Sequence, residues 1–244
     1  MSSQRSLIVS IILLFVASCG TSESVYPEND TYVYYNIDNS IDEDPEMAGF
    51  IRPHVMEMGK IMDQELAVSE GTFVKAAPEG ALGNLVSDIV RYRATSEMRE
   101  RVHISIMNNG SLRVALPEGA ITMGHIYELM PFDNYIVVLK FSGEQILQIV
   151  DELAGVNGEP VSGIRFRIVD GSARDVLVDY MSVNPDQYYW IATNNWIADG
   201  GGTFATMWEP VERHNLDVLV RDAIIDYLRS RQVISPYVDH RIRN

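Results

Sequence analysis

The sequence predicts a single α/β domain that follows an N-terminal export signal. Three observations support the single domain. The 244 residues are 46% hydrophobic, enough to form the core of one large domain or two small ones. Short apolar runs typical of strands alternate with longer runs of helical periodicity between residues 40 and 235. No repeat, low-complexity tract or linker divides that stretch, so we expect one domain.

The first residues have the pattern of an export signal. Arg5 precedes an apolar core from Leu7 to Ala17, and small residues follow it. This core is shorter than the roughly 20 apolar residues that a membrane-spanning helix needs. We therefore expect residues 1–18 to be a signal peptide that is removed.

The only cysteine, Cys19, follows "VAS" (16–18), a run similar to the lipobox of bacterial lipoproteins. In those proteins the cysteine is lipidated, so we expect a lipid anchor in the cell envelope, at the periplasm or outer membrane. The alternative is an ordinary signal peptide with a chance cysteine. Gly20, where an aspartate would suggest inner-membrane retention, favours the outer membrane. Residues 19–40 begin with small, acidic, turn-forming residues and are expected to be a flexible tether.

An amphipathic helix is expected after the tether. Asp44 before Pro45 fits a cap and a first-turn proline, and apolar residues then recur at spacings of three and four. Pro53 interrupts the pattern, so the helix either kinks there or starts there. We interpret its methionines as core filling. The recurring apolar residues are Met47, Ile51, Val55, Met58, Met62 and Leu66.

Regular patterns predict the next elements in order. Residues 79–98 place apolar side chains on one helical face, and a helix over 143–155 ends at Gly155, a typical helix stop. Other apolar runs predict strands, with a brief helix between two of them. The expected strands are 71–77, 102–107, 119–123 and 134–142, and the brief helix is 124–130.

Three more strands and a closing helix complete the domain. Turn sequences at 170–172 and 184–187 separate the strands. The closing helix over 215–231 is amphipathic, with Asn215 in the capping position. We take 41–235 as the domain and 236–244 as a tail. The expected strands are 163–171, 176–183 and 188–196.

The stretch "IMNNGSLR" (106–113) is the first candidate for a binding loop. An apolar strand stops abruptly at "NNGS", and Arg113 follows. Glycine and serine leave room for backbone N–H groups to approach a ligand, and the strand holds the loop in place. A tight turn between two strands explains the same residues. This stretch alone leaves both interpretations open.

A second candidate, "NNWIADGGGTF" (194–204), follows a strand and contains three consecutive glycines. The pattern is not GxGxxG and opens no helix, so it is weak support for a dinucleotide site. A glycine-rich loop beside an exposed Trp196 suits a flat aromatic ligand, because the ring stacks while the backbone approaches closely. The alternative is that Trp196 plugs the core at a strand end.

Charge and motif content argue against several classes of protein. The formal net charge is -15, from 34 acidic and 19 basic residues, which argues against a nucleic-acid partner. The five histidines show no metal-binding spacing such as HExxH, so no metal site is predicted in this chain. Ser111 is not in a GxSxG elbow, and no carboxylate pair suggests acid–base catalysis, so no catalytic residue is predicted.

Four motifs, taken in order, resemble the C-terminal domain of the 5'-nucleotidase family, enzymes that remove phosphate from nucleotides and UDP-sugars. They are "ALGNLVSD" (81–88), "IMNNGSLR" (106–113), "PFDN" (131–134) and "NNWIADGGGTF" (194–204). The resemblance covers roughly residues 40–232 and implies an α+β domain with a mixed sheet and flanking helices. Family members also have an N-terminal metallophosphatase domain with two metals. None of its DxH, GNH[DE] or GHxH motifs occurs in this sequence.

The resemblance implies a pocket for a nucleotide or nucleoside. Phe132 and Trp196 match the two rings that clamp the base, and such stacking is worth about 1 to 3 kcal/mol per base. Asn108 and Arg113 match residues that touch the substrate, where arginine offers a cationic fork to phosphate or ribose oxygens. Asn134 matches an asparagine that contacts the base edge in some members.

Departures from the family pattern lie in the two glycine loops. The three-glycine loop is replaced by "NGS" (109–111), and the second ring, usually phenylalanine, is tryptophan. Gly200 and Gly201 match the glycines of the family's GGD, and Gly202 replaces its aspartate, which holds the ribose hydroxyls. This loss would cost roughly 1.5 to 3 kcal/mol of affinity or permit another ligand. Asp199 lies nearby in the sequence as a substitute.

Three functions follow from the resemblance. In the first, the chain binds the substrate and docks with a separate exported metallophosphatase, which carries the divalent metals. In the second, it is a stand-alone lipoprotein that captures nucleosides or nucleotides. In the third, it is a degenerate domain kept as a scaffold, which would tolerate the loss of either clamp ring.

Overall fold

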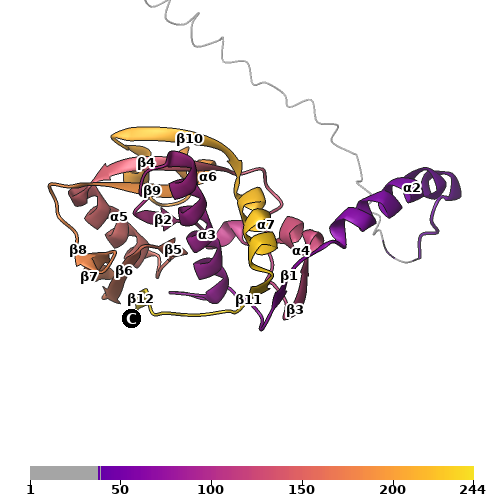
Figure 1. Ribbon diagram of the computed structural model, residues 1–244, viewed down its shortest axis with the longest axis horizontal. Coiled ribbons are helices and arrows are strands. Elements are labelled where there is room, and N and C mark those ends of the chain that lie inside the picture. The colour runs from indigo at the N-terminus through magenta and orange to yellow at the C-terminus, as the bar shows by residue number, and fades with distance from the viewer. Residues whose placement is uncertain (1–37, 39) are drawn as a thin grey trace, which may run out of the picture. The chain divides into compact units, whose positions relative to one another are not determined.

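Three β-sheets and the helices packed against them form the structure, a computed structural model that describes residues 38 and 40–244 (Figure 1). Its mixed sheets and flanking helices confirm the predicted α/β (α+β) class. Residues 49–244 form one compact unit. The expected signal peptide (1–18) and Cys19 lie outside the described residues, as does the tether apart from Asp38 and Ser40.

The central sheet has five strands in the order β10-β4-β9-β2-β5. β4 and β9 pair antiparallel without a break from Ile136 opposite Asn194 to Ser142 opposite Tyr188, and β2 runs parallel to β9. The ends of β2 and β9 and the start of β4 therefore lie at the same edge of the sheet. The bounds are β10 Glu212–Leu219, β4 Tyr135–Ser142, β9 Tyr188–Asn194, β2 Ile104–Ile106 and β5 Val161–Ser162.

Both faces of this sheet are buried. Along β4, Ile136 and Val138 pack into one hydrophobic cluster, and Val137 and Leu139 pack into a second. Side chains alternate between the faces of a strand, so a sheet covered on both sides reads as a continuous apolar run, as in "YIVVLKF". This run is why the sequence predicts β4 within one residue at its start.

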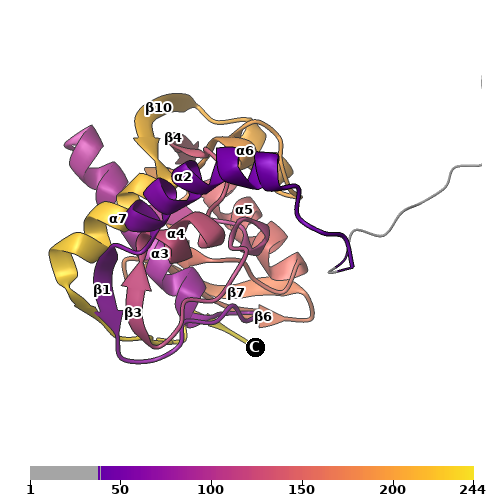
Figure 2. The same ribbon diagram turned by 90° about the vertical axis from the view of Figure 1, so that its right-hand side faces the viewer.

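Helices cover the two faces separately. α3 (Ala81–Met98), α4 (Met123–Leu129) and α7 (Val220–Arg231) pack into the first cluster, and Figure 2 shows the side of the molecule with α4 and α7. α5 (Gly143–Gly155) packs into the second cluster and begins with the predicted residue. Its start is fixed by a capping box, in which Ser142 Oγ accepts from the Gln145 N–H at 3.3 Å and Gln145 Oε1 accepts from the Ser142 N–H at 3.0 Å.

Two smaller sheets flank the central one, in the orders β11-β1-β3 and β12-β6-β7-β8. No helix among the described residues has both the length and the apolarity of a membrane span. Two short 3-10 helices are Asn109–Ser111 and Ala205–Trp208, and a one-turn helix, α6, is Asn195–Ala198. The remaining strands are β1 Glu65–Ser69, β3 Gly119–Thr122, β6 Ile164–Val169, β7 Ser172–Val178, β8 Met181–Ser182, β11 Val233–Ile234 and β12 Ile242–Arg243.

Two expected helices each have one wrong boundary, because strand pairing overrides helical periodicity there. β1 occupies the segment that the sequence assigned to the end of the first helix. The expected strand 71–77 does not form, and within it only Phe73 makes a β-bridge, with Leu116. The closing helix begins at Val220, and Asn215 lies in β10 opposite Val137. "NLDVL" (215–219) alternates polar and apolar residues, which is the strand period. The expected strand 176–183 is also broken, because Asp179 and Tyr180 turn the chain with φ of 49° and 66°.

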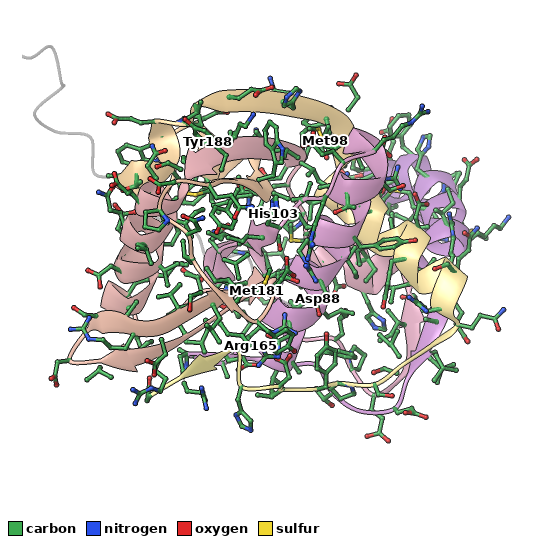
Figure 3. The ribbon with its side chains drawn as sticks, turned by 60° about the vertical axis from the view of Figure 1, so that its left-hand side comes forward. Asp88, Met98, His103, Arg165, Met181 and Tyr188 are labelled. Atoms are coloured by element: carbon green, nitrogen blue, oxygen red, sulfur yellow. The ribbon has the colours of Figure 1, made fainter. Side chains whose placement is uncertain are left out.

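The last residues of the chain belong to the four-stranded sheet β12-β6-β7-β8. In the segment 236–244, expected to be a tail, β12 pairs in parallel with β6. Arg241 is buried at 6% exposure and donates to Asp88 Oδ1 at 2.9 Å and to Asp239 Oδ1 at 2.8 Å. Asp88 on α3 and Arg165 on β6 line the same small pocket as Arg241 and are labelled in Figure 3.

α2 (Pro45–Met62) confirms the first expected helix but not its expected packing. Asp44 Oδ1 accepts from the N–H groups of Glu46 and Met47 at 2.9 and 3.0 Å, which is the expected cap. The helix continues through Pro53. None of its residues is fully buried, but Met62 is half-buried and packs against the first hydrophobic cluster. The interpretation of the methionines as core filling therefore holds in part for Met62 and is wrong for Met47, Met56 and Met58, which are exposed.

Candidate functional site

A pocket of about 320 Å³ lies at the edge of the central sheet where β2 and β9 end and β4 begins. Five of the predicted site residues line it, although the segments that carry them lie far apart in the sequence. The strand directions explain this, since parallel β2 and β9 and antiparallel β4 deliver their flanking loops to one edge. The lining residues are Asn108, Gly110, Ser111, Arg113, Phe132, Asn134 and Trp196.

The loop after β2 turns its backbone amides into the protein. The Asn109 N–H donates to Glu159 Oε2 at 2.6 Å, and the Arg113 N–H donates to the Leu129 carbonyl at 3.0 Å. The Ser111 N–H donates to the Asn108 carbonyl at 3.1 Å. The loop is thus a tight turn that also lines a pocket. A ligand there meets mainly side chains, and of the backbone N–H groups that the sequence suggested, that of exposed Gly110 has no hydrogen-bond partner within the described residues.

Asn194 holds two parts of the pocket together. Its Nδ2 donates to Asn108 Oδ1 at 3.2 Å, and its Oδ1 accepts from the Ile197 N–H at 2.9 Å, capping α6. Asn194 is fully buried. Because α6 carries Trp196, one side chain fixes both the asparagine and the tryptophan of the pocket. Sequence reasoning missed this role, and the capping preference of asparagine is the signal that could have found it.

Two half-exposed aromatic rings stand at this edge. Phe132 is 49% exposed and Trp196 is 48% exposed, so the alternative that Trp196 plugs the core is wrong. The Arg113 guanidinium carbon lies 5.9 Å from the centre of the Phe132 ring, and Arg113 Nη1 donates to the Gly110 carbonyl at 3.3 Å. The pocket therefore combines two flat apolar faces with one cation.

The glycine loop supports the Trp196 ring and does not line the pocket. A Cβ on Gly201 would stand 2.3 Å from Cδ2 of Trp196, and the Gly201 N–H donates to the Trp196 carbonyl at 2.7 Å. Gly200 and Gly202 have φ of +98° and +86°, a conformation that favours glycine. Gly200 thus contributes through its backbone conformation and Gly201 through close packing, because a side chain at 201 would collide with the indole.

Asp199 does not take the place of the missing family aspartate. Its Oδ1 accepts from Arg213 Nη1 at 2.7 Å, and the residue does not line the pocket.

The segment that carries Phe132 is anchored to α7 by two hydrogen bonds. Buried Arg221 donates from Nη2 to Asp133 Oδ1 at 2.7 Å, and the Asn134 carbonyl accepts from the Val220 N–H at 2.8 Å. These bonds fix the directions of Phe132 and Asn134.

Glu159 holds the pocket loop in place by accepting a hydrogen bond from the Asn109 N–H. Sequence reasoning also missed this residue. Burial raises the pKa of Glu159, and the hydrogen bond from the Asn109 N–H opposes this shift. Lys75 Nζ donates to the Asn109 carbonyl at 3.4 Å, and its charge also opposes the upward shift of the Glu159 pKa. With a folded pKa above the unfolded value, the charged carboxylate costs stability at neutral pH, and this cost fades as the pH falls through the folded pKa.

We expect Glu159→Gln to have at least the wild-type free energy of unfolding at pH 7, because it keeps an acceptor oxygen and removes the buried charge. The difference in the free energy of unfolding between Glu159→Gln and the wild type should decrease as the pH is lowered. Glu159→Ala leaves the Asn109 N–H unpaired and should cost about 1 to 3 kcal/mol. Urea unfolding at several pH values measures both. Equal losses in the two variants would contradict this role of the carboxylate.

Within residues 38 and 40–244, no group of three or more histidine, cysteine, aspartate or glutamate side chains could hold a metal ion. The pocket side chains suit recognition of a flat ring and an anionic or hydroxyl group. Neither a nucleophile–base pair nor a carboxylate pair lines this pocket. The arrangement supports binding.

Comparisons with known proteins point to one family. The family model described as 5'-nucleotidase, C-terminal domain, matches residues 58–209. The trifunctional nucleotide phosphoesterase protein YfkN of Bacillus subtilis is 28% identical over 182 residues, which cover 68% of this chain and 12% of that protein. The 5'-nucleotidase of Vibrio cholerae is 22% identical over 209 residues, covering 80% of this chain and 36% of that protein.

A solved structure shares the fold. The 5'-nucleotidase precursor from Thermus thermophilus superposes with a TM-score of 0.70 at 26% identity, covering 81% of this chain and 42% of that chain. The chain thus spans less than half the length of each of these relatives.

Proposed function

This chain belongs to the family of 5'-nucleotidase C-terminal domains, and from that premise we propose that it binds the nucleotide or nucleoside for a phosphohydrolase whose two-metal centre lies on a separate metallophosphatase. The single observation that carries the proposal is the pocket between Phe132 and Trp196. Its side chains come from three separate segments, and each has a chemical counterpart in a nucleotide.

In the proposed complex the base lies between the two rings, where stacking contributes about 1 to 3 kcal/mol. Asn134 and the amide nitrogen of Asn108 donate to the base or sugar edge. Arg113 contacts phosphate or ribose oxygens as a charge-assisted donor. With glycine at 202, the ribose hydroxyls have no carboxylate partner from that loop, so we expect binding to depend on the base more than on the sugar.

The proposed division of labour assigns orientation to this chain. Stacking and the Arg113 contact fix the nucleotide so that its phosphate faces the partner. Divalent metals on the metallophosphatase would activate water and stabilise the displaced oxygens. We also propose that lipidation of Cys19 anchors the chain in the cell envelope, most consistent with the outer membrane, which would hold both proteins at one surface.

Two measurements on the mature chain test this function. Calorimetric titration with adenosine and AMP should show binding without any partner. Phosphate release from AMP with added Mn²⁺ or Zn²⁺ should occur with the tagged chain isolated gently from its native membrane and be absent from the recombinant chain alone. Hydrolysis by the recombinant chain would reveal a catalytic site in it.

The same two measurements separate the alternatives. Binding with no hydrolysis in either preparation would favour a stand-alone nucleoside-binding lipoprotein. Absence of both binding and hydrolysis would favour a scaffold and would refute the pocket assignment.

A further inference from the structure

α2 presents a stripe of large apolar side chains that the described chain leaves open. The five residues of the α2 stripe are between 45 and 71% exposed. They fall within Gly49–Met62, the part of the helix that belongs to the compact unit. The α2 stripe consists of Phe50, Ile51, Val55, Met58 and Ile61.

The spacing places these residues on one helical face. Steps of one, four, three and three residues keep them within about 140° at 100° per residue, and the charged Arg52, Glu57 and Lys60 lie outside that sector. α2 contains Pro53 and two glycines, which disfavour a helix that stands alone in water, and most helices gain their stability from packing an apolar face. His54 lies in the same sector, with its ring 5.9 Å from the Phe50 ring. Large exposed apolar side chains gathered on one helical face are typical of an interaction site.

The position of α2 indicates what covers the stripe. The match to the family of C-terminal domains begins at Met58, within α2, so this helix marks the N-terminal border of the family domain. The Thermus thermophilus relative is matched over only 42% of its chain. Because the matched domain is C-terminal, most of the unmatched part of that relative lies beyond the border that α2 marks.

We propose that the α2 stripe is the docking surface for the separate metallophosphatase, an inference that rests on the function proposed above. α2 carries two acidic and two basic residues, so its net charge is balanced and apolar contact dominates the recognition. The matching surface on the partner is an apolar groove long enough for about three helical turns. This contact would bring the metal centre to a domain that binds nucleotide.

Photo-crosslinking in the native host tests the occupant. Full-length chain carrying benzoylphenylalanine at position 55, on the α2 stripe, should crosslink to a protein that mass spectrometry identifies as a metallophosphatase. The matched control carries the same probe at position 57, on the charged face, and should give little of this product. A crosslink only to a second copy of the chain, or none to protein, would overturn the proposal.

A second test uses function. Val55→Asp places a charge on the stripe at a residue that is 60% exposed, so the fold should not change. AMP hydrolysis co-isolated with this variant should fall about tenfold or more, as for a central interface residue, while Glu57→Lys should retain it. Adenosine binding by the isolated chain should be the same in both variants.

The outcomes distinguish the two proposals. If wild-type and Val55→Asp chains co-isolate equal AMP hydrolysis, the docking surface is wrong and the proposed function stands. If the wild-type chain binds no adenosine and co-isolates no hydrolysis, the proposed function itself is wrong and the docking proposal falls with it.

Discussion

Arg241→Ala should lower the free energy of unfolding by about 3 to 5 kcal/mol, because it removes the buried cation that Asp88 and Asp239 share, although Asp239 keeps its ion pair with Arg165. Arg241 bridges Asp88 and Asp239 and also donates to the Val161 carbonyl at 2.9 Å. The side chains of Asp88 and Asp239 are 31 and 34% exposed, so water compensates part of the loss and the lower end of the range is expected. Without Arg241, these carboxylates and the Val161 carbonyl lose their shared donor.

Tyr237 belongs to the same cluster and cannot replace the lost charge. Burial and the neighbouring Asp88 raise the pKa of Tyr237 to about 12, so its hydroxyl stays protonated and donates to Asp88 near neutral pH. Urea unfolding of the wild type, Arg241→Ala and the neighbouring Arg243→Ala gives the comparison. Arg243 is exposed, so its variant should unfold near the wild-type midpoint. Equal midpoints for both variants would show that the cluster contributes little.

Trp196→Ala should weaken adenosine binding roughly 5- to 150-fold, the equivalent of about 1 to 3 kcal/mol of lost stacking. The ring is half exposed and rests on Gly201, so its removal opens one wall of the pocket without creating a cavity in the core. The free energy of unfolding should therefore change much less than the binding free energy.

Trp208 provides the matched control for that experiment. It is 45% exposed, close to the value for Trp196, but it does not line the pocket. Calorimetric titration with adenosine should give wild-type affinity for Trp208→Ala and reduced affinity for Trp196→Ala. If both variants bind like the wild type, the base does not stack on Trp196 and the pocket assignment is wrong.

The sequence predicted elements well where one local pattern acted alone. α5 has a serine cap, an apolar face and a glycine end, and all of its bounds were predicted. β1 and β10 were missed because apolar residues such as Leu66 and Leu216 fit a helical period as well as a strand. Only pairing with distant strands decides between the two. Exposure of the α2 stripe was likewise invisible, since periodicity identifies an apolar face but not whether anything covers it.

The candidate pocket shows the same difference between what local sequence patterns predict and what depends on distant contacts. The side chains that line it were identified through family motifs, because those motifs preserve residue types in a fixed order. The residues that hold them were not. Asn194 reaches Asn108 across 86 positions, and Glu159 reaches Asn109 across 50, so no local spacing connects either pair. Their roles depend on which strands are neighbours.

The unbroken β4–β9 ladder also limits how this domain can evolve. Phe132 precedes β4 and Trp196 follows β9, so both rings lie at the same end of one antiparallel strand pair. An insertion of one residue in either strand would move one ring by about 3.4 Å and reverse every side chain beyond it between the two buried faces. New ligand preferences can therefore arise by exchanging side chains at the strand ends, while insertions and deletions within the ladder should be purged.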